Sequence, residues 1–145
     1  MKQLLVQDWM RTNVITINSE LRVERAWEVM ERQRVRHLPV VQHERLVGIV
    51  TERDLKRAVF GEPVITKWKG GKPQPTGTPG DLAAAAIMTR NVATAKPTDL
   101  LLSAALRMLD TRIGTLPVVD ESGKLLGILT QTDLVKALVS LLQSE

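Results

Sequence analysis

The segment LPVVQHERLVGIVTERDL, residues 38–55, holds two apolar runs around a short polar stretch and then passes into a charged, helix-like sequence. It returns as LPVVDESGKLLGILTQTDL, residues 116–134, with one residue added between the apolar runs. Pairing 10–41 with 88–119 and 46–58 with 125–137 gives 18 identities in 45 pairs. A repeat of this length indicates two copies of one structural unit, packed about a pseudo-twofold axis. Such an axis creates paired clefts, which are candidate sites for small ligands.

Each copy predicts the order strand, helix, strand, turn, strand, helix. The first strands are expected at Val14–Ile17 and Val92–Ala95, and the helices after them at 21–34 and 100–112, with Ser19 and Thr98 as N-caps. The paired apolar runs predict an antiparallel hairpin in each copy, which turns through His43-Glu44 in the first and through 121–124 in the second. Closing helices are expected from about Glu52 and Gln131.

Residues 60–80 are rich in Gly, Pro and Lys, and this composition predicts a long surface loop or partly disordered linker. A helical turn is expected at 81–86. The sequence thus divides into a first motif at 1–59, a linker at 60–80 and a second motif at 81–145, which together form one domain.

Bulk composition excludes several classes of protein. The chain has 145 residues, 43% hydrophobic, and no apolar run approaches the ~20 residues of a membrane span. The absence of cysteine excludes disulfides and thiolate chemistry and, with no signal-peptide pattern at the N-terminus, favours a cytoplasmic protein. Net charge is a modest +4, and 3% aromatic residues offer no stacking platform for single-stranded nucleic acid.

The ordered motifs resemble the CBS domain, present here as a tandem pair (a Bateman module). The resemblance is carried by Met-x-x-x-Val-x-Thr before the first helix, Arg-His-Leu-Pro-Val-Val at the hairpin and Gly-Ile-Val-Thr-Glu-Arg-Asp-Leu after it, with matching pieces in the second copy. It implies an α+β fold of two β-α-β-β-α motifs packed sheet to sheet. It also implies a non-catalytic, regulatory role such as energy sensing, through AMP, ADP, ATP, S-adenosylmethionine or NAD. The family further implies a homodimer that signals to a separate effector protein.

In related modules each cleft joins the Thr-x-x-Asp of one motif to the first strand and hairpin lead of the other. By that resemblance one cleft comprises Thr51, Arg53, Asp54, Asn91, Val92, Ala93, Ile113, Gly114 and Thr115. The other comprises Thr130, Asp133, Asn13, Val14, Ile15, Val35, Arg36 and His37. The aspartates would grip ribose, the strands would contact adenine, and Arg53, Arg36 and His37 would lie on the phosphate side. Because the cations differ, the two sites are expected to be inequivalent.

Each of these motifs also has a purely structural interpretation. Threonine followed three residues later by aspartate at a helix start approximates a capping box, so Asp54 and Asp133 could serve the fold alone. Arg36 and Arg53 could be ordinary surface arginines, and His37 a histidine that is merely hydrogen-bonded in place.

Three other functions are alternatives to ligand binding. An enzyme is disfavoured because the two histidines, His37 and His43, belong to no nucleophilic triad or metal-ligand spacing. A nucleic-acid binder is disfavoured because glutamates interleave with the arginines of 22–36, as on a solvated helix face. An assembly module with vestigial pockets stays open, since Trp9, Trp27 and the leucines of the last helix could build a dimer face.

Overall fold

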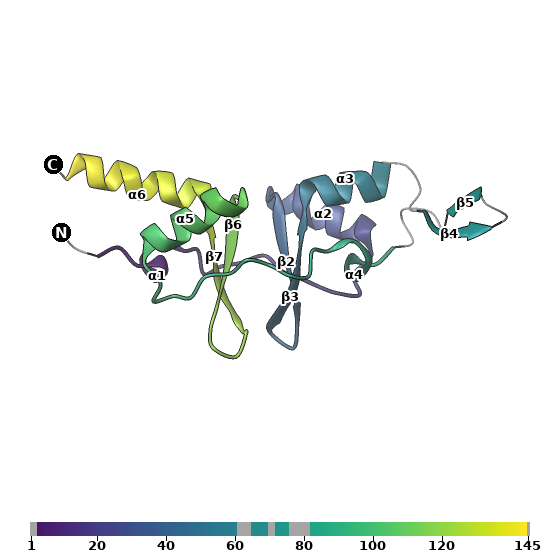
Figure 1. Cartoon of the computed structure of the whole chain (residues 1–145), viewed down its shortest axis with the longest axis horizontal. Coiled ribbons are helices and arrows are strands. Elements are labelled where there is room, and N and C mark those ends of the chain that lie inside the picture. The colour runs from purple at the N-terminus through teal and green to yellow at the C-terminus, as the bar shows by residue number, and fades with distance from the viewer. Residues whose placement is uncertain (1–2, 61–64, 70–71, 76–81, 145) are drawn as a thin grey trace. The chain divides into compact units, whose positions relative to one another are not determined.

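The computed structural model describes residues 3–60, 65–69, 72–75 and 82–144. Its elements follow the predicted order except for the first strand of the second repeat, and the fold is mixed α+β with two copies of one motif (Figure 1). The first repeat contains β1 (Ile17–Asn18), α2 (Val23–Gln33), β2 (His37–Gln42), β3 (Arg45–Thr51) and α3 (Glu52–Phe60). The second contains α5 (Leu101–Thr111), β6 (Thr115–Val119), β7 (Leu125–Thr130) and α6 (Gln131–Gln143). Short helices α1 (Val6–Trp9) and α4 (Ala84–Ile87) precede the two repeats.

The hairpins form as the sequence predicts. Strands β1, β2 and β3 form one sheet in that order, with β1 parallel to β2, while β6 and β7 pair antiparallel. His43 and Glu44 both have positive φ, as a two-residue type I′ turn requires. In the longer turn, Asp120 accepts hydrogen bonds from the backbone N–H groups of Ser122 and Lys124, and Gly123 takes the left-handed conformation.

The first strands are shorter than predicted. Val14–Ile17 was expected as a strand, but the first pairing with β2 begins at Ile17. In the second repeat only Ala95 bridges Val118, so no regular strand forms over Val92–Ala95.

The predicted N-caps Ser19 and Thr98 are wrong. Both lie in turns that precede the helices, and the N-cap positions are Arg22 and Leu100, without side-chain capping bonds. The first N–H of α2, from Val23, donates instead to the carbonyl of Leu82 at 2.8 Å. That of α5, from Leu101, donates to the carbonyl of Leu4 at 2.8 Å. Backbone from distant parts of the chain therefore replaces the local caps.

Two strands occur within the stretch predicted as a surface loop. β4 (Ile65–Lys69) and β5 (Lys72–Pro75) pair antiparallel, and the rest of the predicted linker after Phe60 lies outside the described residues. The predicted helical turn at 81–86 is observed as α4, shifted towards the C-terminus, with Asp81 itself outside the described residues. The predicted boundaries of the motifs at 1–59, 60–80 and 81–145 stay a prediction.

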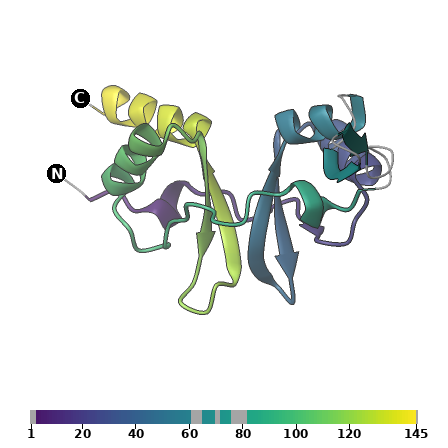
Figure 2. The ribbon, with the colours of Figure 1, turned by 45° about the vertical axis from the view of Figure 1, so that its right-hand side comes forward.

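The chain forms two compact units that are not consecutive halves of the sequence. One comprises residues 1–14, 44–46 and 92–145, and the other 15–43 and 47–91. In the second of these units α2 and α3 pack together, and in the first α5 and α6 lie at one end of the β6–β7 hairpin with its turn at the opposite end (Figure 1, Figure 2).

The two hydrophobic cores use equivalent positions of the repeat. Leu38, Val40 and Met30 in one core correspond to Leu116, Val118 and Met108 in the other. The segments before the repeats are exchanged, however, because Val6 is buried in the core of the second repeat and Ala84 in the core of the first.

Two glycines permit this exchange. A Cβ atom on Gly127 would lie 2.7 Å from the carbonyl oxygen of Arg11, and one on Gly48 would lie 2.9 Å from that of Thr89. Arg11 forms backbone hydrogen bonds with Ile128, and Thr89 forms them with Ile49, at 2.9–3.0 Å. Glycine is therefore required where each leading segment crosses a strand.

Candidate functional site

The Thr-x-x-Asp of the first repeat lies where β3 passes into α3. The backbone N–H of Thr51 donates to Oδ2 of Asp54 at 3.0 Å, and the N–H of Asp54 donates to Oγ1 of Thr51 at 3.2 Å. This is a reciprocal capping box, so Asp54 has the structural role that its spacing allows. The carboxylate is half-buried, which leaves it partly accessible to a ligand.

The aspartate of the same motif in the second repeat accepts more hydrogen bonds and is more deeply buried. Oδ2 of Asp133 accepts hydrogen bonds from the N–H of Thr130 at 2.8 Å and from its hydroxyl at 3.1 Å. Oδ1 accepts a bond from Nε of Arg11 at 3.3 Å, and Asp133 is only 2% exposed. Arg11 belongs to no predicted site, because it lies more than a hundred residues away from Asp133 along the chain. A ligand would have to compete with these bonds for Asp133.

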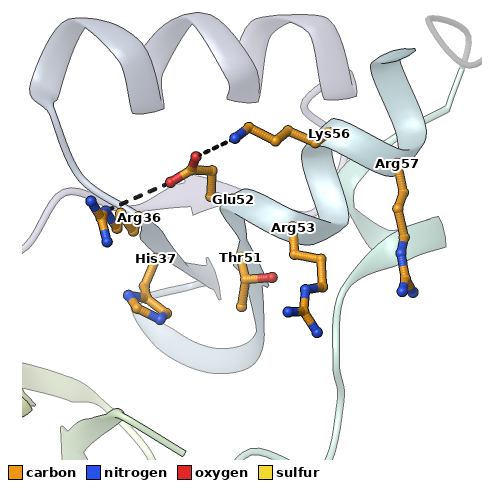
Figure 3. Close-up of a pocket in the computed structure, with 7 residues that line it drawn as sticks. All are labelled: Arg36, His37, Thr51, Glu52, Arg53, Lys56 and Arg57. Carbon is orange, nitrogen blue, oxygen red and sulfur yellow. Dashed lines mark ion pairs between the residues drawn. The ribbon is translucent and has the colours of Figure 1, made fainter. Parts of the chain in front are cut away.

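A pocket of about 570 Å³ surrounds the start of α3 within the first repeat (Figure 3). Four of its lining residues were predicted as site residues: Arg36, His37, Thr51 and Arg53. The family resemblance implies two clefts, with Thr51 and Arg53 in one and Arg36 and His37 in the other, whereas in the structure all four residues line one pocket. The other three lining residues are Glu52, Lys56 and Arg57.

The sequence carried a signal for the three missed residues. Positions three and four apart on a helix share a face, so Lys56 and Arg57 had to lie near Glu52 and Arg53. Figure 3 shows Lys56 pointing towards Glu52, while Arg53 and Arg57 extend from α3 in another direction, on the side of Thr51.

Glu52 is the one carboxylate that lines this pocket. Its oxygens lie 2.8 Å from Nζ of Lys56 and 3.7 Å from Nε of Arg36. The hydrogen bond and the charge of Lys56 lower the pKa of Glu52, and Arg36 and His37 add to the effect. Burial lowers the pKa of His37, the charge of Arg36 lowers it further, and Glu52 opposes both. Burial and Arg36 thus both favour the neutral form of the His37 ring.

The remaining predicted residues are distributed over both repeats. Asn13 and Asn91 are exposed, and the hydrophobic side chains of Val14, Ile15, Val35, Val92 and Ala93 are half-buried. Ile15 and Val35 pack against the core of the first repeat, and Ala93 packs against that of the second. The assembly of these residues into two clefts stays a prediction.

The second-repeat counterparts of Val35, Arg36 and His37 are Ile113, Gly114 and Thr115. Ile113 is exposed, and Gly114 accepts a hydrogen bond from the first N–H of α6, Gln131, at 3.1 Å. Arg36 accepts the equivalent bond from Glu52 at 2.9 Å. Thr115 is buried, and its hydroxyl has no hydrogen-bond partner among the residues that the structure describes.

Two kinds of feature are absent from the described residues. No group of three His, Asp or Glu side chains converges there in the manner of a metal site. None of the described helices is long and apolar enough to cross a membrane.

Comparison with known proteins identifies the repeat. The family model of the CBS domain matches residues 6–61 and again 84–140. Among curated proteins, the chain is 33% identical over 132 residues to protein MJ1225 of Methanocaldococcus jannaschii, and this match covers 91% of the chain and 46% of MJ1225. A homoserine O-acetyltransferase of Methanococcoides burtonii is 37% identical over 89% of the chain, which spans 23% of that enzyme. The chain thus spans less than half the length of these relatives.

Solved structures resemble the chain over nearly its whole length. The CBS domain pair of protein MJ0100, in complex with 5′-methylthioadenosine and S-adenosylmethionine, is 28% identical with a TM-score of 0.76, and the match covers 96% of this chain and 98% of that one. CBSX2 in complex with AMP is 26% identical with a TM-score of 0.76, over 95% and 98% of the two chains. A CBSX2 structure from Arabidopsis thaliana is likewise similar, with a TM-score of 0.75 at 26% identity over 98% and 99%.

Proposed function

Because this chain belongs to the CBS-domain family and carries two copies of the domain, we propose that it is a non-catalytic regulatory module for adenosine-containing ligands. AMP and ATP are the first candidates, and S-adenosylmethionine and NAD are alternatives. The ligand would occupy clefts to which both repeats contribute, and a separate effector protein would respond to its binding.

One observation carries this proposal. CBS pairs that match the chain over more than nine-tenths of both lengths are known with AMP, S-adenosylmethionine and methylthioadenosine bound. These ligands share an adenosine group. The Thr-x-x-Asp motifs support it further, since a carboxylate in the first turn of a helix can accept hydrogen bonds from ribose hydroxyls.

The two motifs are not equally suited to that task. Asp54 is half-buried and bonded to Thr51, whereas Asp133 is almost fully buried and also bonded to Arg11. We therefore assign the stronger site to Asp54, with Arg53 beside the phosphate.

Nucleotide titration by calorimetry and thermal shift tests this proposal. A ligand at 100 times its dissociation constant should raise the free energy of unfolding by ~2.7 kcal/mol. Asp54→Ala should weaken binding, while Asp99→Ala should leave it unchanged. Asp99 is the matched control because its carboxylate also caps a turn, through the N–H of Lys96 at 2.9 Å, and it lies outside the predicted site. Absence of any shift with AMP, ATP, S-adenosylmethionine and NAD would contradict the proposal.

An apolar groove favours assembly as a second function. Leucines of α5 and α6 line a groove of about 520 Å³ together with Gln3 and Leu4. Leu102 is 68% exposed and Leu138 is 54% exposed, which is unusual for a contiguous set of leucines on a monomer. A homodimer through this face would cover them. Leu138→Glu should then convert a dimer to a monomer in light scattering, and a wild-type chain that is already monomeric would contradict this assignment.

A further inference from the structure

The pocket at the start of α3 concentrates positive charge within one repeat. Arg36, Arg53, Lys56 and Arg57 line it together with His37, Thr51 and Glu52 (Figure 3). Among the described residues, Glu52 is the carboxylate that pairs with Lys56 and Arg36, and no ion pair there involves Arg53 or Arg57.

The second repeat shows that the fold does not require this charge. Its positions equivalent to Arg36, Arg53, Lys56 and Arg57 are Gly114, Thr132, Val135 and Lys136, so one cation stands there in place of four. The backbone is nevertheless alike, because the first N–H of α3 and that of α6 bond to equivalent carbonyls at 2.9 and 3.1 Å. The same scaffold thus forms with and without the cations, which makes a purely structural role for them a poor explanation.

The amount of charge indicates the size of the anion. The four cations Arg36, Arg53, Lys56 and Arg57 and the single carboxylate of Glu52 give the pocket three net positive charges before any contribution from His37. A single phosphate monoester carries about −1.5 to −2 at pH 7 and would leave the pocket positive. A chain of two or three phosphates would match it.

The arrangement of donors agrees with an extended anion. Arg53 and Arg57 lie one helical turn apart, about 6 Å along the axis of α3, and extend in the same direction (Figure 3). Planar guanidinium groups suit phosphate oxygens, which they can bind with two hydrogen bonds each. Glu52 meanwhile holds Lys56 and Arg36 at the opposite side of the pocket.

We propose that this pocket of the first repeat binds an oligophosphate group of two or three phosphates, and that the second repeat lacks such a site. For the nucleoside part of the ligand this inference rests on the proposed function. A nucleoside triphosphate and an inorganic oligophosphate share the chemistry that the pocket recognises, so both serve as probes.

Calorimetry in EDTA at one fixed salt concentration tests the pocket with ATP, AMP, inorganic tripolyphosphate and phosphate. ATP should bind at least tenfold more tightly than AMP, and tripolyphosphate should bind while phosphate does not. ATP tighter than tripolyphosphate identifies a nucleotide as the ligand, and the reverse order identifies an inorganic oligophosphate.

Variants of the lining residues test whether the oligophosphate binds in this pocket. Arg57→Ala should weaken ATP and tripolyphosphate by roughly tenfold and change AMP by less than threefold. Lys136→Ala, the same position in the second repeat, is the matched control and should change none of them. Glu52→Gln removes the pocket's carboxylate and should tighten tripolyphosphate, a gain of binding that a misfolded variant cannot produce.

Three results would overturn the inference. The first is equal affinity for AMP and ATP with no binding of tripolyphosphate, which leaves the proposed function intact. The second is an equal effect of Arg57→Ala and Lys136→Ala. The third is displacement of tripolyphosphate by an RNA oligomer at lower concentration than by ATP, which would indicate a general polyanion surface. Binding of tripolyphosphate without any binding of AMP or ATP would instead support the pocket and contradict the proposed nucleotide function.

Discussion

Nε of Arg11 lies 3.3 Å from Oδ1 of Asp133, so a residue from the segment between α1 and β1 contacts the helix start of the second repeat. The repeat offers no equivalent contact for Asp54, because Thr89 stands at the position that corresponds to Arg11. The two aspartates that look identical in the sequence thus have different surroundings.

Arg11→Ala should lower the free energy of unfolding by about 1 kcal/mol, since it leaves one oxygen of a buried carboxylate without its charged partner. The effect is modest because the Arg11 side chain is 54% exposed. Equilibrium unfolding in urea measures it. Arg90→Ala, which removes an exposed hydrogen bond to the carbonyl of Ala85, is the control and should change stability less.

Asp133→Ala should destabilise the protein more than Asp54→Ala does. Loss of a capping carboxylate costs about 0.5–2 kcal/mol, and both variants lose one. Asp133→Ala also removes the bond to Arg11 from a side chain that is 2% exposed, so we expect about 2 kcal/mol against about 1 kcal/mol for Asp54→Ala. Equal losses in urea unfolding would contradict the difference in surroundings.

Thr115→Val should raise the free energy of unfolding by about 1 kcal/mol. The Thr115 hydroxyl is buried without a partner among the described residues, and a buried unsatisfied group is costly. Thr130 lies opposite Thr115 in the β6–β7 pair, and its hydroxyl donates a hydrogen bond to Asp133. Thr130→Val should therefore lower the free energy of unfolding. Thermal unfolding of both variants gives the comparison. If Thr115 also contacts a nucleotide, Thr115→Val will weaken binding while it stabilises the chain.

Gly127→Ala should cost about 1–3 kcal/mol, because the added methyl group would meet the backbone oxygen of Arg11 at 2.7 Å. Gly114→Ala is the control. Its methyl group would approach the Gln131 side chain at 3.1 Å, and a flexible side chain can move away. Similar losses for both variants in denaturant unfolding would show that the crossing at Gly127 is not tight.

Stability should fall as the pH drops below 6.5, in part through His37. Its pKa in the folded protein lies below the ordinary value of 6.5, chiefly because the ring is buried. Well above pH 6.5 the ring is neutral in both states. Below it the unfolded chain takes up a proton that the folded protein resists, so unfolding becomes easier until the pH passes the folded pKa.

His37→Gln should reduce this decline when urea unfolding is followed between pH 7.5 and about pH 5. The same profile for His43→Asn, a change at the other histidine in an exposed turn, serves as the control. An unchanged slope in His37→Gln would contradict the role of His37.

The repeat in the sequence predicted the order of elements, because the apolar positions recur at one offset and fill equivalent places in two cores. The starts of α3 and α6 were predicted at the observed residues, Glu52 and Gln131, since each follows directly from a strand. The starts of α2 and α5 were not, because carbonyls of Leu82 and Leu4 take the place of a local cap. The sequence near Ser19 and Thr98 cannot predict a hydrogen bond to a carbonyl that is so distant in the chain.

The candidate site was likewise predicted only in part. Arg36, His37, Thr51 and Arg53 were identified from the motif, and the structure brings them to one pocket. Lys56 and Arg57 follow the motif by one turn and needed helical geometry to be noticed. Arg11 reaches Asp133 only through the tertiary fold, so its role lay beyond any local pattern.

Neither repeat forms a complete hydrophobic core by itself. Val6 fills a place among the side chains of the second repeat, and Ala84 fills the matching place in the first. A fragment that begins at residue 82 would lack Val6 and would carry Ala84 away from its neighbours. A fragment with one copy alone would leave an unfilled place in its core, so we expect the two copies to fold only when they are present together.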